Sequence, residues 1–273
     1  MTHPAMPPGA CDCHVHVYED GFPLAASANF KPPHGPLSAY RQVQAALGLQ
    51  RVVIVQATGY GFDNSCMLQA VGKLGGAARG VAIVPPDVGD AELQRLHAGG
   101  VRAVRYMTIP GAGGLVTWDS IEAMAAHVAK MGWAINLQLD GRDFPHRKAV
   151  IDRLPCKVVI DHTGKFLEPV KPNDPAFLAL LGVLERGGRW IKLSAPYETS
   201  KVGPPTYDDV SALSKALVRS HPDRCLWASN WPHPNRVPPP SDAGLLALLS
   251  EWAPDAQVRN AILVDNPAAA FGF

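Results

Sequence analysis

Short apolar runs alternate with helical patterns along the whole chain of 273 residues. The run at 52–55 is apolar throughout, as a parallel strand covered by helices on both faces requires. Between the runs, apolar residues repeat at helical spacing, for example at 121, 124, 125 and 128. The predicted strands lie at residues 11–17, 51–57, 80–84, 101–107, 133–139, 157–161, 190–194 and 224–229. The predicted helices include residues 38–47, 64–73, 91–97, 118–130, 176–186 and 207–219.

Nearly every predicted strand ends in a polar or charged side chain. These residues are His16, Gln56, Arg105, Gln138, His162, Ser194 and Asn230. A doubly wound open sheet would show the same alternation of strands and helices. The polar strand ends favour a closed barrel, because TIM-barrel active sites are built where many strand ends converge on one rim. We therefore predict an α/β fold, with residues 1–273 forming a single (β/α)8 TIM-type barrel domain.

The overall charge excludes several kinds of partner. The chain has 25 basic and 24 acidic residues and a formal net charge of +1, so we expect no nucleic-acid partner. No apolar run approaches the roughly 20 residues of a membrane span, and residues 1–10 lack the apolar core of a signal peptide. The five cysteines are scattered and odd in number, which argues against a disulfide framework. We expect a cytoplasmic protein without a membrane partner.

The sharpest motif is Asp12-Cys13-His14-Val15-His16 on the first predicted strand. Side chains alternate along a strand, which predicts that Asp12, His14 and His16 share one face, with Cys13 and Val15 on the other. Two imidazoles pointing into a barrel mouth can bind a metal, or hold a carbonyl and an oxyanion. A pair of structural or surface histidines is the alternative interpretation.

Two further segments combine with this motif. The apolar run at 158–160 ends in Asp161-His162, and the segment at 227–234 reads WASNWPHP. In this order, and with ILVDNPAAAFGF at 262–273, the segments resemble the amidohydrolase superfamily. The similar branch includes 2-pyrone-4,6-dicarboxylate lactonase, 4-sulfomuconolactone hydrolase and D-galactarolactone isomerase. The segment WIKLSAPY at 190–197 adds to the resemblance, which covers essentially the whole chain.

The resemblance implies a metal-dependent-hydrolase-like barrel, and a hydrolase that opens a small carboxylated lactone, in many relatives without a bound metal. By analogy His14, His16 and His162 would contact the lactone carbonyl, and Arg105 would bind a substrate carboxylate. Lys165 matches a position where relatives hold a cation. The expected ligand is a carboxylated lactone or organic acid from aromatic-acid or sugar-acid breakdown, and a homo-oligomer is compatible with the fold. The further substrate-binding candidates are Gln56, Gln138, Lys192 and Tyr197.

The sequence departs from the family at Asn230, where relatives usually carry an aspartate. An amide cannot accept a proton at neutral pH, so we expect a histidine to serve as the base, with His162 favoured and His14 second. His233 is a further candidate if its loop folds back over the site. Asp161 should point to the opposite face from His162, and Asp12 should orient His14 or His16.

The departure at Asn230 also argues against a metal, and we expect no cofactor. If a metal is present, His14, His16 and His162 would supply the three ligands of a zinc site. Three other functions remain open from the sequence. They are a metal-dependent decarboxylase or hydratase of the same superfamily, a lactone isomerase, and a non-catalytic protein that binds an organic acid.

Overall fold

A computed structural model describes residues 6–273 and confirms the predicted barrel. Eight parallel strands form one sheet in which each strand pairs with the next, from β1 to β8. The strands are β1 (Cys11–Val15), β2 (Arg51–Val55), β3 (Ala78–Ala82), β4 (Val101–Met107), β5 (Ala134–Gln138), β6 (Lys157–Ile160), β7 (Arg189–Leu193) and β8 (Cys225–Trp227). A bridge between Val15 and Trp231 joins the two edges, so the sheet is a nearly closed barrel.

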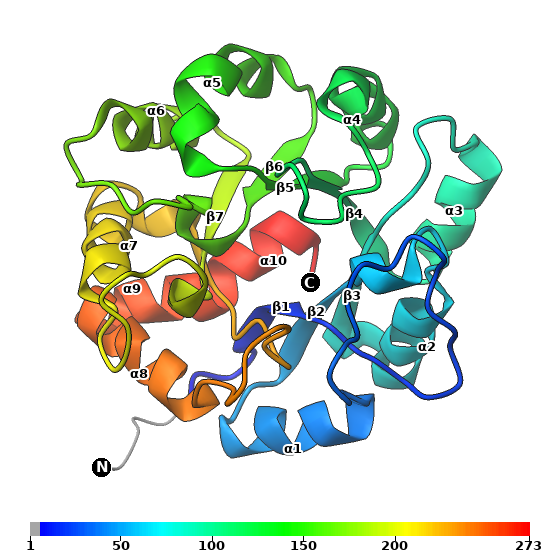
Figure 1. Ribbon diagram of the computed structural model, residues 1–273, viewed down its shortest axis with the longest axis horizontal. Coiled ribbons are helices and arrows are strands. Elements are labelled where there is room, and N and C mark those ends of the chain that lie inside the picture. Colours follow the sequence, from blue (N-terminus) through cyan, green and yellow to red (C-terminus); the bar gives the residue numbers. More distant parts are fainter. Residues whose placement is uncertain (1–5) are drawn as a thin grey trace.

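A ring of helices surrounds the strands (Figure 1). The helices are α1 (Leu37–Ala46), α2 (Ser65–Leu74), α3 (Asp90–Ala98), α4 (Ile121–Ala129), α5 (Phe144–Arg153), α6 (Pro175–Leu184), α7 (Asp208–Ser220), α8 (Asp242–Trp252), α9 (Ala256–Asn260) and α10 (Asn266–Phe271). The predicted helices all form, and most ends are shifted by one or two residues. The helix predicted at 118–130 begins three residues later, because residues 118–120 form a 3-10 turn. The prediction did not include α5, whose buried residues are Phe144 and Ile151, because two apolar positions make a weak stripe.

Short helical turns connect these elements. Those of the 3-10 type are η1 (Thr58–Tyr60), η2 (Gly75–Ala77), η3 (Trp118–Ser120), η4 (Gly141–Asp143), η5 (His162–Gly164), η6 (Pro196–Glu198) and η7 (Pro222–Arg224). A π-helical turn, η8 (Ala261–Asp265), precedes α10. Turns η1, η4, η5 and η6 follow β2, β5, β6 and β7, so they form part of the rim at the carboxyl ends of the strands.

Apolar side chains form two layers. The larger cluster fills the space between the strands and the helices, whereas a smaller cluster fills the inside of the barrel with residues such as Val53, Val81 and Ala103. Helix α10 adds Phe271 to the inner cluster, and crosses the centre of the barrel in Figure 1. Lys157, the first residue of β6, donates to the Ala269 carbonyl, so α10 lies at the end where the strands begin.

Strand β1 contains an irregularity that corrects the predicted alternation. Its pairing register with β2 shifts between Asp12 and Val15. Cys13 belongs to the inner cluster, and His14 also points inward, so two consecutive residues share the inner face. Asp12 faces outward and accepts a hydrogen bond from Tyr40 of α1. The prediction that Asp12 shares a face with the histidines was wrong, because a bulge adds one residue to the strand.

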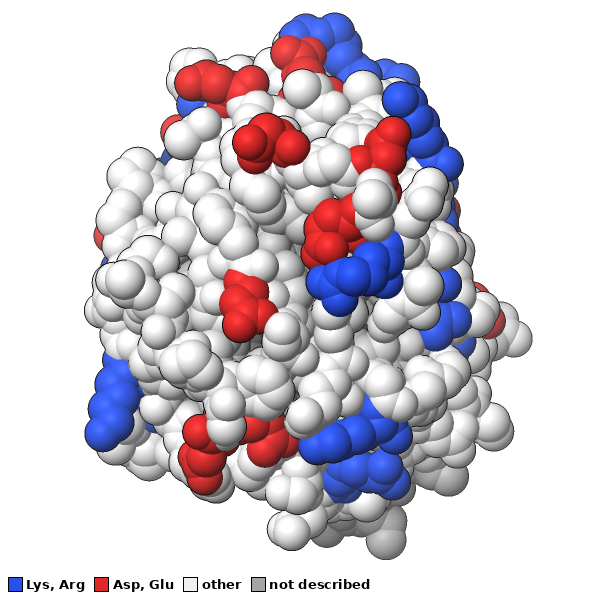
Figure 2. All heavy atoms as spheres, turned by 90° about the vertical axis from the view of Figure 1, so that its right-hand side faces the viewer, with Lys and Arg blue, Asp and Glu red and all other residues white. Residues whose placement is uncertain are grey.

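The surface carries charges of both signs. On the face that presents α2 and α3, acidic and basic side chains form small separate groups among uncharged residues (Figure 2). No concentrated basic patch lies on this face of the described residues, which fits the near-neutral net charge. In the part of the chain from residue 6 onward, no helix combines the length and apolar character needed to cross a bilayer.

Candidate active site

A cavity of about 390 Å³ opens at the carboxyl ends of the strands. Six of the sequence-predicted site residues line it, namely His16, Arg105, Gln138, His162, Lys165 and Asn230. The loop at 110–114 contributes Gly111 and Ala112 to the rim, and Thr58 follows β2. Four predicted residues do not line the cavity. His14, Gln56 and Tyr197 are buried behind it and contact lining residues, and Lys192 is buried below it and contacts His14.

Lys192 lies inside the barrel, under the floor of the cavity, and its side chain is inaccessible to solvent. Its ammonium lies 2.9 Å from Asp161 Oδ1, 2.6 Å from Asn136 Oδ1 and 3.1 Å from His14 Nδ1. These three acceptors match the three protons of an ammonium. Burial raises the pKa of Asp161, but the Lys192 charge beside it holds that pKa well below its usual range. The pair is therefore a buried, hydrogen-bonded ion pair.

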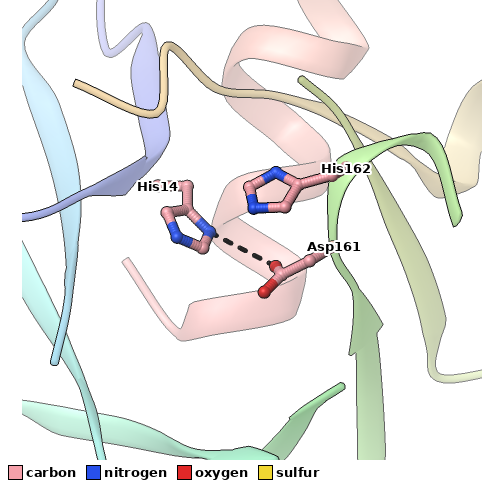
Figure 3. A group of neighbouring side chains, drawn as sticks. All are labelled: His14, Asp161 and His162. Atoms are coloured by element: carbon pink, nitrogen blue, oxygen red, sulfur yellow. Dashed lines mark hydrogen bonds and ion pairs between the residues drawn. The ribbon is translucent and has the colours of Figure 1, made fainter. Parts of the chain in front are cut away.

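The position of Asp161 corrects another expectation. We predicted that it would point away from His162, but both side chains lie inside the barrel beside His14 (Figure 3). Strand β6 ends at Ile160, and His162 and Thr163 adopt positive φ values of 53°. The two-residue alternation of a strand does not extend through this turn. Asp161 and His162 therefore reach the same interior space from consecutive positions.

The hydrogen bonds assign the protons of the two histidines of β1. His16 Nδ1 lies 2.8 Å from the Val55 carbonyl and must donate to it, so its Nε2 is an acceptor. His14 Nε2 lies 3.2 Å from that acceptor and donates to it. His14 Nδ1 then carries no proton and accepts a hydrogen bond from the Lys192 ammonium. Burial and the Lys192 charge lower the pKa of His14, and burial with the Arg105 charge lowers that of His16 to about 3, so both rings are neutral.

This arrangement of protons does not fit a metal ion. His14, Asp161 and His162 bring potential ligand atoms within 4.8 Å of one another. However, the Lys192 ammonium already occupies Asp161 Oδ1 and His14 Nδ1. The proton on His14 Nε2 fills the space between His14 and His16. A divalent ion at either place would meet a positive charge or an N–H group instead of free electron pairs.

His162 is the second imidazole that lines the cavity, beside His16. Its Nδ1 lies 2.9 Å from Ser194 Oγ, which can accept the Nδ1 proton and leave Nε2 unprotonated. Burial lowers the pKa of His162 well below its usual value, although the Asp161 charge opposes the shift. A neutral imidazole with a free Nε2 can accept a proton from a bound molecule.

Arg105 extends from β4 into the cavity and is 6 % exposed. One terminal nitrogen donates to the Gln56 carbonyl at 2.9 Å, and the other lies 3.4 Å from Gln138 Oε1. Its Nε has no hydrogen-bond partner among the described residues. Gln56 itself donates from its side chain to the Gly61 and Asp63 carbonyls, so it fixes the loop after β2.

A chain of hydrogen bonds fixes the orientation of Asn230. Its Nδ2 lies 3.0 Å from Tyr197 Oη, which lies 2.9 Å from His233 Nδ1, and His233 Nε2 lies 3.0 Å from Asp242 Oδ1. His233 therefore supports Asn230 from behind and does not line the cavity. Asn230 has a positive φ of 62°, as expected for a residue type that tolerates the left-handed region.

Asp12 does not orient either imidazole, contrary to the prediction. Its side chain accepts hydrogen bonds from the Ser229 backbone and hydroxyl at 3.0 and 2.6 Å. It also accepts from Tyr40 and from the backbone N–H of His14. Burial raises the pKa of Asp12 to about 6, although the bonds from Ser229 act in the opposite direction. Asp12 thus joins β1 to the segment after β8, close to Asn230.

Glu198 is a cavity residue that the sequence prediction missed. It lies in η6 after β7, forms an ion pair with Lys165, and its Oε1 lies 3.2 Å from Asn230 Nδ2. Burial lowers the pKa of Lys165 to about 8, although the Asp161 charge acts in the opposite direction. The signal available in the sequence was that the predicted strand at 190–194 is followed closely by a carboxylate, as barrel-rim residues often are.

Comparison with known proteins gives matches over nearly the full chain. The profile of the amidohydrolase family matches residues 11–273. A D-galactarolactone isomerase of Agrobacterium fabrum is 33% identical over 98% of this chain and 93% of its own length. A 2-pyrone-4,6-dicarboxylate hydrolase of Comamonas testosteroni is 35% identical over 96% of this chain and 90% of its own. An apo crystal structure from Agrobacterium tumefaciens, 33% identical, superposes with a TM-score of 0.92 and covers 99% of this chain and 98% of its own. The chain therefore belongs to the amidohydrolase family, as its sequence motifs predicted.

Proposed function

We propose that this protein is a hydrolase that opens the ester ring of a small carboxylated lactone, and that it does so without a metal ion. The observation that carries the proposal is a buried guanidinium without a carboxylate partner beside a neutral imidazole in one cavity. Arg105 can bind a substrate carboxylate, because it lines the cavity and forms no ion pair among the described residues, and His162 offers Nε2 to a proton. Two relatives with similar sequences are named as a lactone hydrolase and a lactone isomerase.

In the proposed reaction, His162 Nε2 takes a proton from water while the water oxygen attacks the ring carbonyl carbon. The carbonyl electrons move to the carbonyl oxygen. The Lys165 ammonium, which also lines the cavity, stabilises the negative charge that forms there. When the oxyanion collapses, the bond between the carbonyl carbon and the ring oxygen breaks. His162 then returns its proton to the departing ring oxygen, and the product is a hydroxy acid.

The low pKa of His162 makes this imidazole a weak base until substrate binds. Burial keeps the free imidazole neutral, so it is ready to accept a proton, but its affinity for that proton is low. A bound carboxylate brings a negative charge into the cavity, and a nearby negative charge raises the pKa of an imidazole. We infer that the substrate itself strengthens the base.

The contacts of Lys192 with Asp161 and His14 support the metal-independent form of the proposal. Lys192 and the His14 proton occupy the places that a cation would need. The Lys192 charge supplies positive potential below the imidazoles instead. Neither of the alternatives that require a metal, a decarboxylase or a hydratase, gains support from this arrangement of donors.

The test is turnover of a panel of carboxylated lactones by chelator-treated protein in water labelled with oxygen-18. Hydrolysis places one labelled oxygen in the product carboxylate, and acid is released. We expect label in the product of at least one lactone without added metal. Turnover that appears only after zinc is restored would overturn the metal-independent proposal and make His14 and His16 candidate ligands.

Lactone isomerisation is the second candidate function, and Asn230 favours it. An amide in place of the family aspartate cannot activate water, and isomerisation needs no water. In that reaction a hydroxyl oxygen of the substrate attacks the ester carbonyl carbon, the bond from this carbon to the old ring oxygen breaks, and the hydroxyl proton passes to the departing oxygen. The same labelled experiment separates the two reactions. An isomerase converts the lactone to another lactone with no label and no net release of acid.

A further inference from the structure

The cavity contains two cations, and their surroundings differ. Lys165 forms an ion pair with Glu198, and both side chains line the cavity. Arg105 forms no ion pair with any carboxylate of the described residues, and its Nε lacks a hydrogen-bond partner. A buried cation without an anion is costly unless a ligand supplies one. The cavity therefore has a place for one negative charge.

Glu198 makes a second negative charge unfavourable. It is the only carboxylate among the described residues that line the cavity, and its side chain is 18 % exposed. A ligand with two carboxylates would have to displace Glu198 from Lys165, or hold its second charge close to Glu198. Either arrangement places like charges together in a partly desolvated space, where repulsion is strong.

The hydrogen-bonding groups of the cavity select for donors on the ligand. Both protons of Asn230 Nδ2 are directed to Tyr197 and Glu198, which leaves Oδ1 as the free atom of the amide. An amide oxygen and a carboxylate can only accept hydrogen bonds, so they suit hydroxyl groups. Asn29, Thr58 and Asn235 add further polar groups to the lining. A flat unsaturated ring without hydroxyls has no protons to offer them.

We propose that the cavity binds a saturated, hydroxylated ring with a single free carboxylate, and that Glu198 excludes flat rings with two carboxylates. The inference rests on the proposed function for the identity of the ring as a lactone. It assigns Arg105 to the carboxylate and assigns Asn230 and Glu198 to the ring hydroxyls. It also separates the two kinds of relative, because a galactarolactone carries hydroxyls and one free carboxylate, whereas a pyrone dicarboxylate carries two carboxylates and no hydroxyl.

The experiment measures binding, so that it does not depend on turnover. Titration calorimetry compares two inert rings, quinate and pyridine-2,6-dicarboxylate, with the wild-type protein. Quinate is a saturated ring with four hydroxyls and one carboxylate, and the pyridine is flat with two carboxylates. We expect the wild type to bind quinate more tightly by about tenfold or more.

The variant Glu198→Gln keeps the size and an acceptor oxygen but removes the charge. We expect it to shift the preference toward pyridine-2,6-dicarboxylate by at least about tenfold, because Lys165 becomes free to bind the second carboxylate. The matched control is Glu168→Gln, which removes an exposed carboxylate paired with Lys201 outside the cavity. The control should leave the wild-type preference unchanged.

The outcomes separate this inference from the proposed function. Equal binding of both rings, tighter binding of the dicarboxylate, or binding of neither by the wild type would overturn the inference, even if a lactone is turned over. Preferential binding of quinate would support it, even if no lactone in the panel is opened. A Glu198→Gln variant that folds and keeps the wild-type preference would show that Glu198 does not set the selection.

Discussion

The two polar layers of the barrel differ in how completely their charges are paired. Below the cavity floor, the Lys192 ammonium has three acceptors, and the Asp161 carboxylate also accepts from Asn136 at 2.8 Å. Above the floor, Arg105 has an unpartnered Nε, and His162 presents a free Nε2 to the cavity. The lower layer is complete without a ligand, whereas the upper layer lacks partners that only a bound molecule can supply.

This difference separates two roles that similar residues could play. A fully paired buried charge fixes protons and side-chain orientations, and its loss destabilises the fold. An unpartnered charge in a cavity keeps its interactions for a ligand, and its loss affects binding or reaction. We therefore expect substitutions above the floor to change activity with little effect on stability, and substitutions below it to lower stability.

The largest expected effect comes from the upper layer. His162→Ala removes the proposed base, and kcat/KM on a lactone that the wild type opens should fall about 10²- to 10⁴-fold. The urea midpoint of unfolding should change little, since His162 has one side-chain partner. His146→Ala, which alters an exposed histidine of α5, is the control and should retain full activity. Unchanged kcat/KM in His162→Ala would remove His162 from the reaction.

The next effect tests the lower layer. Lys192→Met leaves Asp161 buried without its cation, and the free energy of unfolding should fall by about 3–5 kcal/mol in urea titrations. Adding Asp161→Asn should recover part of this loss, because the uncompensated charge disappears. Lys73→Met on the surface of α2 is the control and should have little effect.

The same Lys192→Met variant sharpens the conclusion about metals. Without the ammonium, His14 Nδ1 can donate to Asp161, 3.3 Å away, and both Nε2 atoms of the β1 histidines then present electron pairs 3.2 Å apart. Equilibrium dialysis should therefore detect more zinc on the variant than on the wild type. Stoichiometric zinc on the wild type would contradict the proton assignment.

The third effect is a dependence of stability on pH. The folded-state pKa of His16 is about 3, and those of His14 and His162 are also lowered, so the unfolded chain binds more protons below about pH 6.5. Stability should fall as the pH drops from about 6.5 toward 3, by about 1.4 kcal/mol per pH unit for His16 alone. Asp12, with its pKa raised to about 6, should offset part of the loss between pH 6 and 4. Urea unfolding at pH 7, 6 and 5 measures the slope, and a flat profile would contradict the burial of neutral imidazoles.

The smallest expected effect concerns the support of Asn230. Tyr197→Phe removes the hydroxyl that accepts from Asn230 and contacts His233, so kcat/KM should fall by about tenfold or less. Tyr207→Phe is the control, because that hydroxyl forms no hydrogen bond with any of the described residues. A loss as large as that in His162→Ala would mean that Tyr197 takes part in the reaction directly.

The sequence predicted the parts of the molecule that follow regular periods. All eight strands and the six named helices form, because apolar periodicity reflects which faces are buried. Arg105 and Gln138, which the sequence placed near strand ends, line the cavity, because parallel strands bring their carboxyl ends to one rim. Their roles stay a prediction.

The errors occur where the backbone departs from those periods. The bulge in β1 turns Asp12 outward. Asp161 is extended and continues the inward face of Val159, and the left-handed conformation of His162 turns that side chain inward as well. Glu198 follows Ala195, which has a positive φ of 48°, so strand alternation could not place its side chain. The pairing of Lys192 with Asn136 and His14 depends on three distant strands, and a single sequence contains no local signal for it.

Phe271 of α10 lies beneath the lower layer, with the Lys192 ammonium 5.9 Å from the centre of its ring. The hydrocarbon of this ring polarises weakly, so it screens the Lys192 charge little. The positive potential of Lys192 therefore stays strong at the imidazoles above it. A helix at the amino-terminal end of the strands thus contributes to the electrostatic potential at their opposite end. A polar replacement of Phe271 would therefore change the pKa values of the imidazoles, although Phe271 does not line the cavity.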